Sequence, residues 1–67
     1  MVEFIDVCFE QNINSLSKMD LVNLLIGQYS YIKDLSIEVI CVLPNYTIEF
    51  KVEGCEKLIN KLICDLD

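Results

Sequence analysis

The chain has 67 residues, the size of one small domain, so residues 1–67 are expected to fold as a single unit. Eleven acidic residues stand against five lysines, with no arginine or histidine, and the net charge is −6. Nucleic-acid phosphates are bound mainly by clustered Lys and Arg, so this charge argues against direct binding to DNA or RNA. No signal-peptide pattern opens the sequence and no apolar stretch reaches the length of a membrane span. We therefore expect a cytoplasmic protein with no membrane contact.

Residues 2–10 alternate between apolar and mixed positions, which is typical of a strand with one buried face. One face carries Ile5, Val7 and Phe9, and the other carries Val2, Phe4, Asp6, Cys8 and Glu10. Residues 11–17 are rich in Asn and Ser and are predicted to form a loop. Ser17 is a good N-cap for the helix that follows, and Asp20 places a carboxylate near the positive end of that helix.

This first helix is predicted to extend to about Lys33 or Asp34. Its main apolar stripe, at helical spacing, comprises Leu21, Leu24, Leu25, Tyr29, Ile32 and Leu35. The apolar arc is widened by Met19, Val22 and Ile26, and only a narrow polar back remains. Contact with one sheet would not use so wide an arc, so the helix is expected to be buried on more than one side.

Two further strands are predicted, over residues 36–43 and 46–53, joined by a turn at Pro44 and Asn45. The second of them alternates clearly. Tyr46, Ile48, Phe50 and Val52 lie on one face, and Thr47, Glu49, Lys51 and Glu53 lie on the other. The first contains an apolar run, Val39–Leu43, without alternation. Because successive side chains of a strand point to opposite faces, this run offers apolar groups on both sides of the sheet.

Gly54 ends the last strand, and a second helix is predicted from Cys55 to about Leu66. Its apolar stripe comprises Cys55, Leu58, Ile59, Leu62, Ile63 and Leu66. The order β-α-β-β-α predicts an α+β two-layer sandwich, a three-stranded sheet with both helices on one face. It matches a ferredoxin-like unit that lacks its last strand, which would leave the first strand as an exposed edge.

The four cysteines show no metal-binding spacing, and no histidine is present to complete a zinc site, so no metal and no cofactor are expected. Cys8 and Cys41 are expected to be buried as small apolar side chains. Cys55 belongs to the apolar stripe of its helix. Cys64 falls on the polar face, so it is expected to be exposed or to lie in an interface.

No arrangement of residues typical of an enzyme is present, and we expect none of the residues to be catalytic. Asp6 is the one carboxylate on a fairly apolar strand face. We interpret it as an edge-strand charge that discourages over-association rather than as a catalytic acid.

The surplus of apolar surface and the acidic charge favour a small, homodimeric protein-binding module. We predict a stoichiometric inhibitor or adaptor, of the immunity-protein or phage-encoded type, whose other partner is an unidentified and basic protein. The uncovered patch is predicted to form where Ile40 and Val42, or Val39 and Cys41 in the other register, lie beside Phe4 and Cys8. The predicted interface residues are Phe4, Cys8, Ile40, Val42, Tyr31 and Cys64.

Two alternatives remain. A small-molecule-binding module would hold its ligand between protomers, with Tyr31, Asn23 and Ser30 as its polar groups. A metal or redox protein would use the four cysteines.

Overall fold

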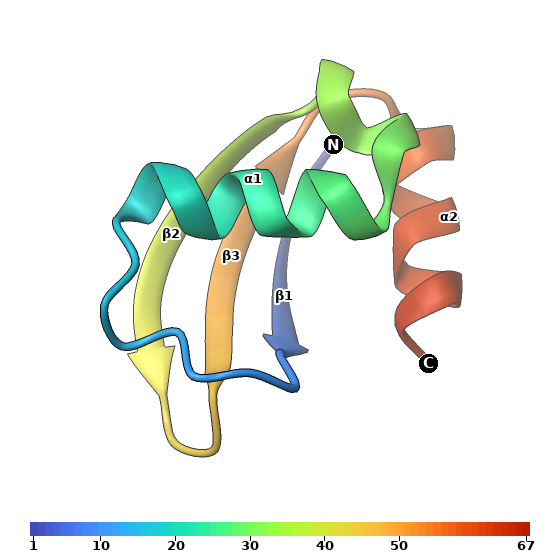
Figure 1. Cartoon of the computed structure of the whole chain (residues 1–67). Coiled ribbons are helices and arrows are strands. Elements are labelled where there is room, and N and C mark those ends of the chain that lie inside the picture. Colours follow the sequence, from blue (N-terminus) through green and yellow to red (C-terminus); the bar gives the residue numbers. More distant parts are fainter.

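The computed structural model describes all residues from 1 to 67 and confirms the predicted β-α-β-β-α order (Figure 1). A short 3₁₀ helix, η1, is added between α1 and β2. The elements are β1 (Val2–Cys8), α1 (Lys18–Gln28), η1 (Ser30–Asp34), β2 (Ser36–Leu43), β3 (Thr47–Glu53) and α2 (Glu56–Leu66).

The three strands form one antiparallel sheet in the order β1-β3-β2, so β1 and β2 are both edge strands. In Figure 1, α1 passes in front of β2, β3 and β1, and α2 stands beside β1. Both helices contribute to one core with the same face of the sheet, as predicted: Leu21 and Leu25 come from α1, and Ile59 and Leu62 from α2. All 14 buried residues are apolar.

The first helix is shorter than the sequence predicts. It begins as expected, with the Ser17 hydroxyl accepting a hydrogen bond from the Asp20 amide at 3.1 Å, but it ends at Gln28. Tyr29 leaves helical geometry, with φ −133° and ψ 74°. Gly, Tyr and Ser are weak helix formers, and this segment contains all three. The change of direction lets η1 and the residue after it place Ile32 and Leu35 in the core.

A β-bulge at Ile40 interrupts the apolar run of β2. Val39 pairs with Phe50 and Cys41 pairs with Glu49, so Ile40 is an extra residue without a partner of its own. The bulge reverses the alternation, and Val42 therefore lies opposite inward-facing Ile48. Of the run, only Val39 is buried, and Val42 is 61% exposed.

The turn between β2 and β3 holds two consecutive residues at positive φ, Asn45 at 63° and Tyr46 at 57°. The placement of Tyr46 on the inward face of the strand is therefore wrong, and its side chain is exposed in the turn. Asn tolerates this left-handed geometry because its short polar side chain bonds locally, whereas Tyr adopts it at a cost.

Candidate interaction surface

On the face of the sheet turned away from the helices, the edge strand β1 carries exposed apolar side chains and the central strand β3 carries polar ones. On β1 the side chains of Val2 and Phe4 are exposed, Phe4 at 58%. Phe4 lies opposite Lys51 of β3, which lies opposite Glu38 of β2. This face is therefore divided along its length by β3.

The strand order separates the residues that were predicted to form one patch. Phe4 and Cys8 lie on β1, while Ile40 and Val42 lie on β2, and β3 runs between the two pairs. The predicted contact between these pairs is wrong, because adjacency in this sheet follows the order β1-β3-β2 and not the chain order. β3 therefore separates the exposed Phe4 from the exposed Ile40, and the bulge places Val42 opposite inward-facing Ile48.

The backbone of β1 is paired on one side only. The Gly54 amide donates to the Met1 carbonyl at 3.0 Å, and the Phe9 amide donates to the Tyr46 carbonyl at 2.9 Å. In an antiparallel ladder, alternate residues exchange hydrogen bonds with the partner strand. The amide and carbonyl groups of the odd-numbered residues of β1 therefore point toward β3. The even-numbered ones, Val2, Phe4, Asp6 and Cys8, point their amide and carbonyl groups away from it; we call them the free-edge residues.

The two edges of the sheet differ in how they are protected. The β2 edge is broken by the bulge at Ile40, and Pro44 follows the strand directly. Bulges and prolines are devices that keep other strands from pairing with an edge. The β1 edge pairs with β3 in an unbroken register from Val2 to Cys8 and contains no proline and no lysine. β1 is therefore the edge that is open to another strand.

A groove of about 260 Å³ lies between β1 and α2. Its floor and walls are formed by the β1 residues Glu3, Phe4, Ile5 and Asp6 and the α2-side residues Ile63, Leu66 and Asp67. We call it the β1–α2 groove. Its apolar wall comes from the half-buried Ile63 and Leu66, and its charged groups are all acidic.

A like-charge pair lies beside this groove on the outer face. Asp6 of the free edge is directly opposite Glu49 of β3. Like charges at directly opposed positions destabilise a sheet, and neither carboxylate forms an ion pair in the structure. Glu49 and Asp6, which are neighbours across the two strands, therefore make the outer face acidic at the free edge of β1.

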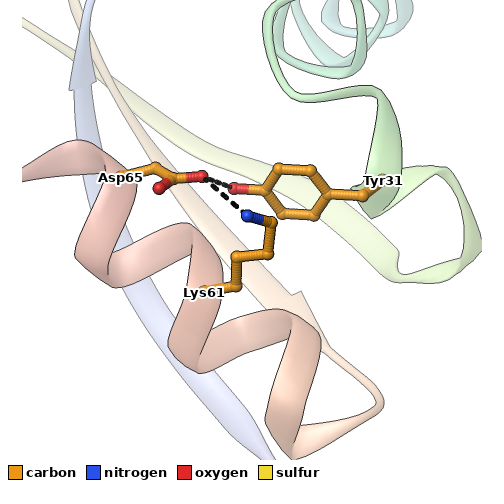
Figure 2. Close-up of polar contacts among 3 residues, drawn as sticks. All are labelled: Tyr31, Lys61 and Asp65. Carbon is orange, nitrogen blue, oxygen red and sulfur yellow. Dashed lines mark hydrogen bonds and ion pairs between the residues drawn. The ribbon is translucent and has the colours of Figure 1, made fainter.

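Tyr31 ties η1 to α2 and so fixes the helix that forms the groove wall (Figure 2). Its hydroxyl donates a hydrogen bond to Asp65 Oδ2, and Lys61 Nζ lies 3.8 Å from the same oxygen. Lys61 Nζ also lies 4.8 Å from the centroid of the Tyr31 ring, within the range of a cation–π contact. Tyr29 packs edge-to-face on Tyr31, with the ring centroids 6.3 Å apart.

These contacts raise the pKa of Tyr31 from 10.0 to about 12. Desolvation is the largest cause, followed by the hydrogen bond to Asp65 and by the charges around the ring, Cys64 among them. Tyr31 and Cys64, both predicted as interface residues, thus lie where η1 meets α2, Tyr31 on η1 and Cys64 next to Asp65 on α2. Tyr31 is half-buried in contacts within its own chain, whereas Cys64 is exposed.

All four cysteines are free and exposed, so the prediction that Cys8 and Cys41 are buried is wrong. Both belong to the uncovered side of the sheet, where no helix packs. The Cys8 thiol donates to the Asn45 carbonyl at 3.2 Å, and the Cys41 thiol donates to Glu49 at 3.4 Å. The Glu49 hydrogen bond is the main cause that raises the pKa of the Cys41 thiol.

The residues considered for other kinds of site are scattered. No three Cys, Asp or Glu side chains are grouped so that they could hold a metal ion. Asn23 lines a hollow on α1 together with Gln11 and Gln28, while Tyr31 is directed at α2, so these two predicted ligand-binding groups lie apart within one chain.

Sequence reasoning missed the groove wall, because Ile63 and Leu66 belong to the same apolar stripe as the buried residues of α2. It also missed the Lys61–Asp65 pair, although the i,i+4 spacing is visible in the sequence.

No protein-family model, no curated protein and no solved structure matches this chain. None of its helices has the length and apolar character needed to cross a membrane.

Proposed function

We propose that this chain is a small acidic protein-binding module that acts by binding another protein, in the manner of a stoichiometric inhibitor or adaptor. The observation that carries the proposal is the open β1 edge, which combines unpaired backbone groups with the exposed side chains of Val2 and Phe4. Edges without a bulge or a proline pair readily with other chains, and the Asp6 carboxylate at this edge repels acidic strands rather than basic ones. Aromatic side chains are enriched in protein interfaces, which agrees with the exposure of Phe4.

The sequence also predicts a homodimer; at this edge we propose instead that the partner is a different protein. Edge-to-edge pairing of two β1 strands would join two chains that each carry a net charge of −6. It would also bring two rows of Asp6 and Glu49 into one continuous sheet. Like-charge juxtaposition suppresses association, whereas a basic partner would be attracted to the same surface.

Site-specific photocrosslinking tests this proposal. A photoreactive phenylalanine analogue in place of Phe4 is expected to crosslink to one discrete protein in extracts of the cell that makes the chain. The same analogue in place of Met19, which is 74% exposed on α1, is the matched control and is expected to crosslink to nothing discrete. A crosslink from Phe4 only to a second copy of this chain, or to no protein, would contradict the proposal.

A further inference from the structure

We propose that the partner contributes an extended, basic segment that adds to the sheet as a fourth strand, antiparallel to β1, along the β1–α2 groove. The inference rests on the proposed function and names the chemistry of the partner segment. Adding a strand to an exposed edge is an established mode of peptide recognition, in which backbone hydrogen bonds give affinity and alternate side chains give specificity.

The backbone of β1 sets the length and register of the added strand. The free-edge residues span Val2–Cys8 and present an amide and a carbonyl at every second position. In an antiparallel pair, the residues opposite Phe4 and Asp6 would each exchange two hydrogen bonds with them. A segment of about seven residues therefore covers the edge.

The groove sets the character of the inward side chains. Between the free-edge residues, the side chains of Ile5 and Val7 point toward the helices, and Ile63 and Leu66 of α2 line the groove beside β1. Inward positions of an added strand would extend this apolar wall, so the segment carries apolar residues at every second position. They would bury the parts of Ile63 and Leu66 that the chain leaves half-exposed.

The charges set the outward side chains. Asp6 and Glu49 are two carboxylates at directly opposed positions of β1 and β3. In the added strand, the residue opposite Asp6 would lie on the other side of Asp6 from Glu49. Glu3 and Asp67 add two more carboxylates to the groove, and no lysine lines it. Opposite charges at directly opposed positions stabilise a sheet, so a lysine or arginine belongs opposite Asp6.

Nuclear magnetic resonance with designed peptides tests the inference on the whole chain. The probe is the peptide Thr-Val-Lys-Ile-Tyr-Lys-Val, with its first lysine opposite Asp6 and its tyrosine opposite Phe4. Amide shifts are expected at the free-edge residues and along α2 near Ile63, with none at the β2 edge. Shifts centred on β2, or none at all, would overturn the proposal.

Two matched pairs of controls separate strand addition from unspecific attraction. Methylating the peptide nitrogens of the tyrosine and the first lysine, which face β1, is expected to weaken binding by about tenfold or more. Methylating the isoleucine nitrogen, which faces away, is expected to leave it within about twofold. The substitution Asp6→Lys is expected to weaken the lysine peptide and to favour a variant in which only the first lysine is replaced by Glu, because the second lysine lies opposite Glu3. Equal losses from both methylations would overturn the proposal.

The outcomes also separate this inference from the proposed function. If the peptide fails while the analogue in place of Phe4 still crosslinks to a discrete protein, the chain binds its partner by another geometry, and only the inference falls. If both experiments fail, the proposed function falls with it. A dimer detected by light scattering, with the amides of Phe4 and Asp6 already protected, would show that a second copy fills the edge and would overturn the inference.

Discussion

The two glycines of this chain are expected to respond in opposite ways to alanine. Gly54 joins β3 to α2 and has a φ of 147°, a conformation that residues with a side chain rarely adopt. A Cβ at this position would lie 2.7 Å from Cδ2 and 3.7 Å from Cα of Leu35, whose side chain is in the core. At Gly27, within α1, a Cβ would meet no atom within 4 Å.

The magnitudes follow from these two environments. Backbone strain of this kind costs about 1–3 kcal/mol, and forcing a methyl group against a packed side chain costs about 1–3 kcal/mol more. A domain of this length has a free energy of unfolding of about 3–10 kcal/mol. Gly54→Ala is therefore expected to remove much of the stability and to loosen the placement of α2 beside β1. Gly27→Ala is expected to add about 0.5–1 kcal/mol, because alanine favours the helix.

Urea unfolding followed by far-ultraviolet circular dichroism measures both changes on the same scale. The transition midpoint is expected to fall sharply for Gly54→Ala and to rise for Gly27→Ala. Equal midpoints for Gly54→Ala and the original chain would refute the close approach of Leu35 and the strained link between β3 and α2. A lower midpoint for Gly27→Ala would contradict the open space that the structure shows around a side chain at this position of α1.

Three further predictions concern single side chains. Titration followed by the absorbance of tyrosinate is expected to show one late step at about 12, absent in Tyr31→Phe. This pKa lies above the unfolded value of 10.0, so the contribution of Tyr31 to stability is full below pH 10.0 and is lost as the pH rises toward about 12. The stability of Tyr31→Phe is expected not to fall in this way over the same pH range. Alkylation of Cys41, referenced to Cys64, is expected to accelerate in Glu49→Gln; an unchanged rate would contradict the role of that hydrogen bond. Ser17→Ala is expected to lower the free energy of unfolding by about 1 kcal/mol in the same urea assay, and no change would contradict the N-cap.

Much of the fold could be predicted because the periodicities are clear. The alternation of residues 2–10 and the stripe of α2 each place apolar side chains on one face, and both elements form, although β1 ends at Cys8. The end of α1 could not be predicted, since the break at Tyr29 depends on the sheet to which Ile32 and Leu35 must return. The bulge at Ile40 was equally hidden, because its neighbours Val39 and Val42 are apolar in either register.

The candidate surface could be predicted in part. The exposure of Phe4 follows from the alternation of β1, and the edge position of β1 follows from the β-α-β-β-α order. The α2 residues that line the groove beside this edge could not be predicted in the same way. Ile63 and Leu66 belong to the apolar stripe of α2, and only the position of the helix beside β1 leaves them half-exposed in a groove.

The open edge of β1 is tested most directly by residue-resolved hydrogen exchange of the free chain at low concentration. The amides of Phe4 and Asp6 are expected to exchange at nearly the rate of an unfolded chain, because they point away from β3. The amides of Ile5 and Val7, which bond to β3, are expected to exchange orders of magnitude more slowly. Protection of Phe4 and Asp6 equal to that of Ile5 would contradict the open edge and the strand addition built on it.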